Sequence, residues 1–121
     1  MGLPRFVLGV LGFLSLTGCA GPTLYYWGQY EDSLLVRYRD VSAEGRQRAF
    51  AMLERTIAEA EQDGRKVPPG VCADLGYLLY QQNRIPDAIS YFRREANAYP
   101  ESRYLMDSII SRLEPRVRPP Q

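Results

Sequence analysis

The chain has 121 residues, of which 15 are basic and 14 acidic, so its formal net charge at pH 7 is +1. This balance lacks the basic surplus on which nucleic-acid binding depends, and we expect no nucleic-acid partner. The sequence has no histidine, which excludes imidazole general bases and histidine metal ligands, and it has no zinc-type cysteine cluster, phosphate loop or G-x-S-x-G motif. We therefore expect neither an enzyme nor a bound cofactor.

The first predicted element is an apolar segment from about Phe6 to Thr17. It is shorter than the roughly 20 apolar residues that a bilayer-spanning helix needs. Its length, together with the basic Arg5 that precedes it, is typical of a secretory signal peptide. We therefore predict that residues 1–18 are cleaved off.

The segment ends in Leu16-Thr17-Gly18-Cys19, which resembles the lipobox of bacterial lipoproteins. The resemblance implies that the thiol of Cys19 takes a diacylglycerol and that the new amino terminus is acylated as well. Several acyl chains give a stable membrane anchor, whereas one gives only marginal binding. By resemblance to sorting rules in enteric-type bacteria, Ala20 after the cysteine favours the outer membrane, on its periplasmic side. The alternative is a plain signal peptide with a chance cysteine.

Beyond the signal peptide we expect three parts. Residues 19–28 form a lipid-anchored tether, residues 29–114 a helical domain, and residues 115–121, with the sequence PRVRPPQ, a disordered tail. Cys72 is the only other cysteine, so we expect no disulfide within the chain. We interpret Cys72 as a small buried apolar residue rather than a reactive thiol.

An unusual aromatic cluster precedes and enters the first predicted helix, which covers residues 29–39. Its members are Tyr25, Tyr26, Trp27 and Tyr30. Helical spacing places Trp27, Tyr30 or Glu31, Leu34 and Tyr38 near one face, and we expect Trp27 and Tyr30 to pack on the second and third helices. The alternatives are a partner-binding patch, since such sites are enriched in Trp and Tyr, or a belt at the membrane interface beside the lipid anchor.

Four further helices follow. The second runs from a cap at Ser42 to the stop at Asp63-Gly64, the third covers about residues 71–82, the fourth about 86–99 from a first-turn proline, and the last extends from a cap at Ser102 to residue 113. Apolar residues recur at spacings of three and four, as on one face of a helix: Ala49, Met52, Leu53, Ile57, Ala60, Ala88, Ile89, Phe92, Ala96, Leu105, Met106, Ile109, Ile110 and Leu113. No segment alternates as a strand does, so the predicted fold class is all-α.

The third and fourth helices together resemble one tetratricopeptide repeat, over residues 69–102. The matching positions are Leu75, Gly76, Ala88, Phe92 and Pro100. The small residues let the two helices approach closely, Phe92 fills the space between them, and the proline ends the unit. The resemblance implies a body of antiparallel helical hairpins, with residues 29–64 as a degenerate first repeat and the last helix as a solvating cap. The alternative is an ordinary helical hairpin that matches by chance.

Two positions depart from this repeat pattern, and three others fall on its concave face. Cys72 stands where the motif prefers Trp. Glu95 stands where it prefers Ala, and we expect it to be awkward against the following helix. Tyr77, Tyr80 and Gln81 fall at the places that line the concave face, and they are further candidates for partner binding; the alternative for Tyr77 is core packing.

The front of the chain, with its lipobox and the sequence YYWGQYE, resembles a family of small bacterial lipoproteins with no assigned function. In such families the gene often lies beside other lipoproteins, including one similar to the curli secretion channel. The resemblance therefore implies envelope proteins as partners.

These features favour a scaffold or assembly lipoprotein that holds a partner through its helical surface. A pilotin-like role, escorting a secretion or pilus component, is one version of this function. The alternative is an envelope enzyme or small-ligand binder, against which the absence of histidine and of a paired-acid motif counts.

Overall fold

The computed structural model of the protein describes residues 23–117. Its regular elements are five α-helices: α1 (Tyr30–Arg39), α2 (Ala43–Gln62), α3 (Val71–Gln81), α4 (Ile85–Ala98) and α5 (Arg103–Leu113). The prediction of an all-α fold with about five helices is confirmed. The predicted signal peptide, Cys19 and the end of the predicted tail lie outside the described residues. Within residues 23–117, none of the helices combines the length and the apolar character needed to cross a bilayer.

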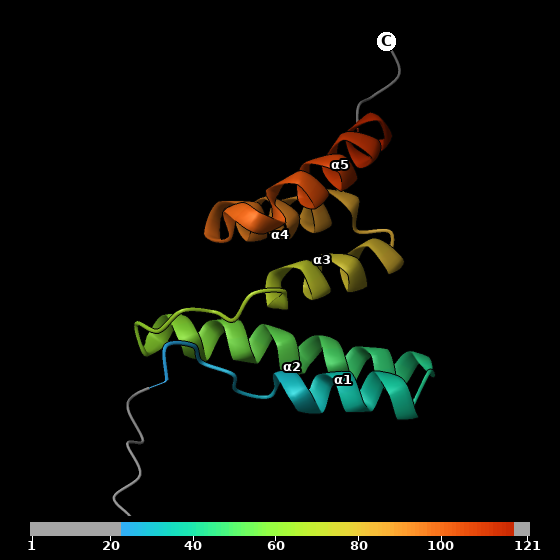
Figure 1. Cartoon of the computed structure of the whole chain (residues 1–121). Coiled ribbons are helices and arrows are strands. Elements are labelled where there is room, and N and C mark those ends of the chain that lie inside the picture. Colours follow the sequence, from blue (N-terminus) through green and yellow to red (C-terminus); the bar gives the residue numbers. More distant parts are fainter. Residues whose placement is uncertain (1–22, 118–121) are drawn as a thin grey trace, which may run out of the picture.

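The helices form a stack in which each one packs mainly on its neighbours in the sequence (Figure 1). The pair α1–α2 lies at one end of the stack and α5 at the other, with α3 and α4 between them. The order of the helices in space therefore follows their order in the chain, which is the arrangement that stacked helical hairpins produce.

The hairpin of α3 and α4 is held by a close approach at Gly76. A Cβ atom at this position would lie 2.9 Å from Cε1 of Phe92 and 3.2 Å from the carbonyl oxygen of Ala88. Gly76, Ala88 and Phe92 are all buried. The small residues and the phenylalanine that carried the repeat resemblance thus make the contact that the motif implies.

The predicted start and stop of α2 are confirmed. Oγ of Ser42 accepts a hydrogen bond from the backbone N–H of Gly45 at 3.0 Å, which satisfies one of the free donors of the first turn. At the other end Gly64 adopts φ +62°, the left-handed conformation that glycine takes most readily.

The predicted boundaries near α4 and α5 need correction. Helix α4 begins at Ile85, so Pro86 is its second residue. Ser102 makes no side-chain cap, because a 3₁₀ turn over Pro100–Ser102 leads into α5 with Ser102 already in a helical conformation. An N-cap needs an extended backbone for its side chain to reach back. Leu105, assigned to the apolar face, is exposed.

The predicted tether and tail also differ from the structure where it describes them. Residues 25–28 pack on the domain: the backbone N–H of Tyr26 donates to the carbonyl of Lys66 at 2.9 Å, within an isolated parallel bridge between Tyr25 and Lys66. At the other end, Glu114–Arg116 form a 3₁₀ turn that extends the helical body into the segment assigned to the tail. The folded body therefore begins before residue 29 and continues past residue 114, because backbone hydrogen bonds that composition does not reveal hold both segments.

Glu95 does not oppose the following helix, as the repeat pattern had suggested. Its side chain is buried, with 1% of the residue exposed, and its Oε1 accepts the backbone N–H of Gly70 at 2.7 Å. Gly70 is the N-cap residue of α3 and has φ +91°. The carboxyl group therefore lies at the N-terminal, positive end of the α3 dipole, where an acidic group is stabilising.

We expect Glu95→Ala to lower the free energy of unfolding by about 2 kcal/mol, because the N–H of Gly70 would lose its partner. Glu95→Gln keeps an acceptor oxygen and should cost less. Denaturant unfolding followed by circular dichroism measures both variants, and a Glu95→Ala protein as stable as the wild type would contradict this role.

Candidate functional site

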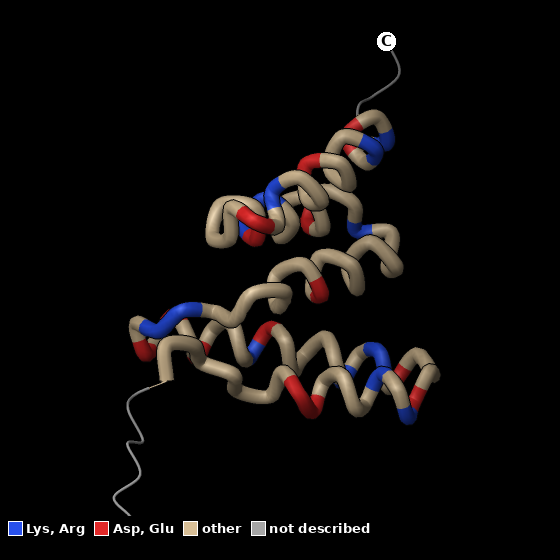
Figure 2. The backbone as a smooth tube through the Cα atoms, viewed as in Figure 1, with Lys and Arg blue, Asp and Glu red and all other residues tan. Residues whose placement is uncertain are grey.

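An apolar groove lies between α3 and α5, with α4 beneath it. Its volume is about 450 Å³, and its lining residues are Ala73, Asp74, Tyr77, Tyr80, Phe92, Met106, Ile109, Arg112, Leu113 and Arg116. Helix α3 supplies one wall, and its single charged residue is Asp74; the rest of this helix is tan in Figure 2, which marks residues without a charged side chain. The groove thus combines apolar walls with a few charged groups, as binding sites commonly do.

Two exposed tyrosines form the α3 wall of the groove. Tyr77 and Tyr80 are one helical turn apart, and their rings stack with centroids 6.4 Å apart and planes at 28°. Half of Tyr77 and 37% of Tyr80 remain accessible to solvent. These two predicted positions therefore lie together on one surface, and neither is packed away in the core.

Gln81 lies outside this groove. It lines separate hollows beside Leu78 and Arg46, on the side of α3 that faces α2. Of the three residues that the repeat pattern assigned to one face, the structure thus brings two together in the groove. On a helix, residue 81 lies about 100° from 80 but about 40° from 77, so Tyr77 borders both the groove and one of the hollows that Gln81 lines.

The acidic residue of the groove has an ion-pair partner, whereas its two arginines do not within residues 23–117. Asp74 is neutralised by Arg37, at 2.9 Å between Nη2 and Oδ2, and it also accepts the hydroxyl of Tyr30 at 3.2 Å. No ion pair within residues 23–117 involves Arg112 or Arg116. The guanidinium group of Arg116 lies 5.9 Å from the centroid of the Tyr80 ring. The rim therefore presents positive charge on the α5 side.

Sequence reasoning missed the α5 half of the groove. Met106 and Ile109 had been assigned to the apolar face of the last helix, but no role had been given to Arg112 or Arg116. The signal was present in the spacing: Ile109, Arg112 and Arg116 follow one another at three and four residues.

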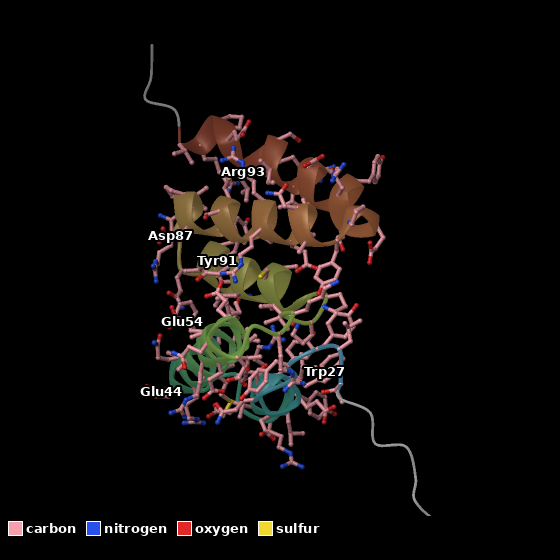
Figure 3. The ribbon with its side chains drawn as sticks, turned by 90° about the vertical axis from the view of Figure 1, so that its left-hand side faces the viewer. Trp27, Glu44, Glu54, Asp87, Tyr91 and Arg93 are labelled. Atoms are coloured by element: carbon pink, nitrogen blue, oxygen red, sulfur yellow. The ribbon has the colours of Figure 1, made fainter. Side chains whose placement is uncertain are left out.

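The N-terminal aromatic residues form a second cluster, which adjoins the groove through the hydrogen bond from Tyr30 to Asp74. The rings of Tyr25 and Trp27 meet edge to face at 6.1 Å, and those of Trp27 and Tyr30 stack at 6.1 Å. Tyr26 is turned away, with its hydroxyl donating to Oε2 of Glu59 at 2.7 Å; this hydrogen bond is the main cause of its raised pKa. Figure 3 shows Trp27 near the start of the described chain, at the α1–α2 end of the stack.

The expectation that Trp27 packs on the second and third helices is wrong, because Trp27 is 44% exposed; Leu34 and Tyr38, on the same predicted face, are exposed as well. The face of α1 that meets α2 is centred instead on Ser33, which is fully buried, and the backbone N–H of Gln29 donates to Oγ1 of Thr56 at 3.0 Å. Because a small residue allows two helices to pack closely, Ser33 makes the contact between α1 and α2 in place of the aromatic residues.

Tyr30 is the member of the cluster that does point inward. It is partly buried and packs against the core. Burial and the neighbouring carboxylate of Asp74 raise the pKa of its hydroxyl, which therefore stays protonated and donates to Asp74 at neutral pH.

Comparison with known proteins places most of the chain in a family. Residues 24–109 match the family described as Domain of unknown function (DUF4810). The chain belongs to this family. No curated protein and no solved structure matches the chain.

The DUF4810 region contains the aromatic cluster and the α3 wall of the groove, since Trp27, Tyr77 and Tyr80 all lie within residues 24–109. It ends inside α5, so Arg112 and Arg116 follow it. Within residues 23–117 there is no group of three or more acidic or cysteine side chains that could hold a metal ion.

Cys72 is buried at the start of α3, as expected, with 3% of the residue exposed. Burial raises the pKa of its thiol to about 11. Because the thiolate is the reactive form, the group is unreactive at neutral pH.

We expect Cys72 in a Cys19→Ser variant to react with a thiol reagent far more slowly in the native protein at pH 8 than in denaturant. A thiol pKa above the ambient pH leaves little thiolate, and raising the pH should increase the rate by roughly tenfold per unit below that pKa. Timed labelling followed by mass spectrometry measures the rate. Rapid stoichiometric labelling of the folded protein would contradict the burial of Cys72.

Proposed function

We propose that this protein is a lipid-anchored scaffold of the bacterial envelope that holds a partner protein in the groove between α3 and α5. The observation that carries the proposal is the groove itself, with the stacked, exposed rings of Tyr77 and Tyr80 on one wall and the guanidinium groups of Arg112 and Arg116 on its rim.

The groove favours a partner segment with apolar side chains and at least one carboxylate. Tyrosine and arginine are enriched among the residues that dominate binding energy at protein interfaces. A carboxylate forms its strongest hydrogen bonds with guanidinium groups, and Arg112 and Arg116 have no ion-pair partner within residues 23–117. The charge of Asp74 is already balanced by Arg37, so it does not oppose such a segment.

The partner can be sought by affinity capture from envelope membranes with three versions of the lipidated protein. The wild type is compared with a Tyr77→Ser/Tyr80→Ser variant and with Tyr104→Ser, which changes an exposed tyrosine outside the groove. We expect one or more proteins to be captured by the wild type and by Tyr104→Ser but lost with the groove variant. Identical sets from all three versions would contradict the proposal.

The membrane anchor is proposed from the lipobox at Leu16–Cys19. We expect the mature protein to begin at Cys19, to carry acyl chains and to partition into the detergent phase, because several chains are needed for stable attachment. Cys19→Ala should leave an unprocessed precursor. Intact-mass measurement tests this, and a mature protein that begins elsewhere without lipid would contradict the anchor.

A further inference from the structure

Residues 23–26, the first described residues after Cys19, are hydrogen-bonded to the loop that follows α2. Nη2 of Arg65 donates to the carbonyl oxygen of Tyr25 at 2.6 Å and also contacts Thr23, while its guanidinium group lies 5.1 Å from the centroid of the Tyr26 ring. The backbone hydrogen bond from Tyr26 to Lys66 adds a further link. Residues 23–26 are therefore part of the folded body.

This attachment limits how far the body can be from the anchor. Four peptide steps separate Cys19 from Thr23, and an extended chain spans at most about 14 Å over four residues. If Cys19 is acylated, as proposed above, the end of the stack that holds Thr23 stays within this distance of the bilayer. Helix α1 lies at this end and α5 at the opposite end (Figure 1).

The outward face of this end is apolar and aromatic. Leu24 is 61% and Trp27 44% exposed, and Leu34 and Tyr38 continue the stripe along α1. Leu34 and Tyr38 are about one turn apart and lie on one side of α1, and Trp27, which precedes the helix, stacks on Tyr30 one turn before Leu34. Ser33, which is fully buried, lies on the side of α1 that packs on α2. Leu24, Trp27, Leu34 and Tyr38 thus all keep solvent-exposed surface.

We infer that this stripe, Leu24, Trp27, Leu34 and Tyr38, rests on the lipid headgroup region of the membrane that holds the acyl chains. Trp and Tyr are enriched at this level of a bilayer, where their rings contact both apolar and hydrated groups. The two acidic and two basic residues of α1 near its ends balance each other, so charge does not draw the helix to lipid. The anchor supplies the high local concentration that a weak contact needs.

This orientation places α5, which supplies one wall of the groove, at the end of the stack opposite the end held near the bilayer. The inference rests on the proposed anchor at Cys19, and it accounts for why the aromatic face of α1 is exposed rather than packed.

Trp27 is the only tryptophan of the chain, so its fluorescence reports on this one site. The lipidated full-length protein is reconstituted into vesicles of phosphatidylethanolamine and phosphatidylglycerol, with or without bromine on the acyl chains near the headgroups. We expect Trp27 to lose most of its emission in the brominated vesicles. Flotation of the same samples measures whether the protein is attached.

Two single-tryptophan variants serve as matched controls. In Trp27→Phe/Tyr38→Trp the reporter stays on the stripe, and we expect quenching. In Trp27→Phe/Tyr104→Trp it moves to α5, at a residue 90% exposed, and we expect the emission to remain. Circular dichroism verifies that both variants are folded.

Attached protein whose Trp27 is unquenched would overturn the inference and leave the anchor intact. Equal quenching at all three positions would also overturn it, since the contact would not be specific to α1. Protection of Trp27 from a soluble quencher without bromine quenching would show that a protein, a partner or a second copy, covers the stripe instead. Failure to float would contradict the anchor itself, and the inference with it.

Discussion

Replacing Phe92 with alanine is expected to lower the free energy of unfolding by about 3–5 kcal/mol, the usual cost of truncating a buried phenylalanine. Phe92 is 3% exposed, and its ring lies against Gly76. Because glycine has no side chain, nothing from this position of α3 can fill the cavity that alanine would leave. Small domains are stable by about 5–15 kcal/mol in total, so this variant would be unfolded or nearly so. Denaturant unfolding followed by circular dichroism measures the change.

Arg93→Ala is the matched control on the same helix. Its side chain is exposed and forms a surface ion pair with Glu114 at 2.7 Å, and Figure 3 shows it in the part of the stack formed by α4 and α5. Exposed ion pairs contribute about 0–1 kcal/mol, so the transition should shift little. If Phe92→Ala unfolded at the same denaturant concentration as this control, the packing of α3 on α4 would not be the centre of the fold.

Reversing the charge of the groove rim should have the largest effect on binding. We expect Arg112→Glu/Arg116→Glu to weaken binding of the captured partner by roughly thirtyfold, which corresponds to about 2 kcal/mol, because two guanidinium groups that attract its carboxylates become repulsive. The wild-type affinity should also fall as salt is raised. Isothermal titration of the purified partner at low and high salt measures both effects.

Arg103→Glu changes the charge on the same helix outside the groove lining. Nine residues separate positions 103 and 112, so they lie on opposite sides of α5. We expect this variant to bind like the wild type. Equal losses for the rim and control variants would mean that net charge, and not the groove, determines the affinity.

Much of the helical body could be predicted from the sequence because local signals and packing agree there. Ser42 and Gly64 mark α2 through capping chemistry that depends on a few neighbouring residues. Gly76, Ala88 and Phe92 mark the α3–α4 contact because only small residues permit it. In these elements the sequence pattern and the tertiary contacts favour the same structure.

The orientation of α1 could not be predicted from hydrophobicity. Tyr30 packs on the core as expected, but Trp27 is exposed, since the close contact with α2 is made through Ser33. Glu95 was misjudged for a similar reason: its partner is the N–H of Gly70, 25 residues earlier in the chain. Both features depend on long-range contacts that residue type alone does not specify.

The candidate site was predicted in part. Tyr77 and Tyr80 follow from their places in the repeat pattern, since one helix carries both. Arg112 and Arg116 join them only through the packing of α5 on α4, which brings the end of α5 beside α3. Residues of the site that share one helix can therefore be predicted from their spacing in the sequence. The combination of residues from two helices depends on how the helices pack.

The central claim is that the groove between α3 and α5 holds a partner in the envelope, and site-specific photo-crosslinking in living cells tests it most directly. A benzophenone amino acid replaces Tyr80 in one strain and Tyr104, on the exposed start of α5, in another. We predict an adduct of defined mass from position 80 that is absent from position 104 and is lost in the Arg112→Glu/Arg116→Glu background. The absence of an adduct at position 80, or the same adduct at both positions, would contradict the claim.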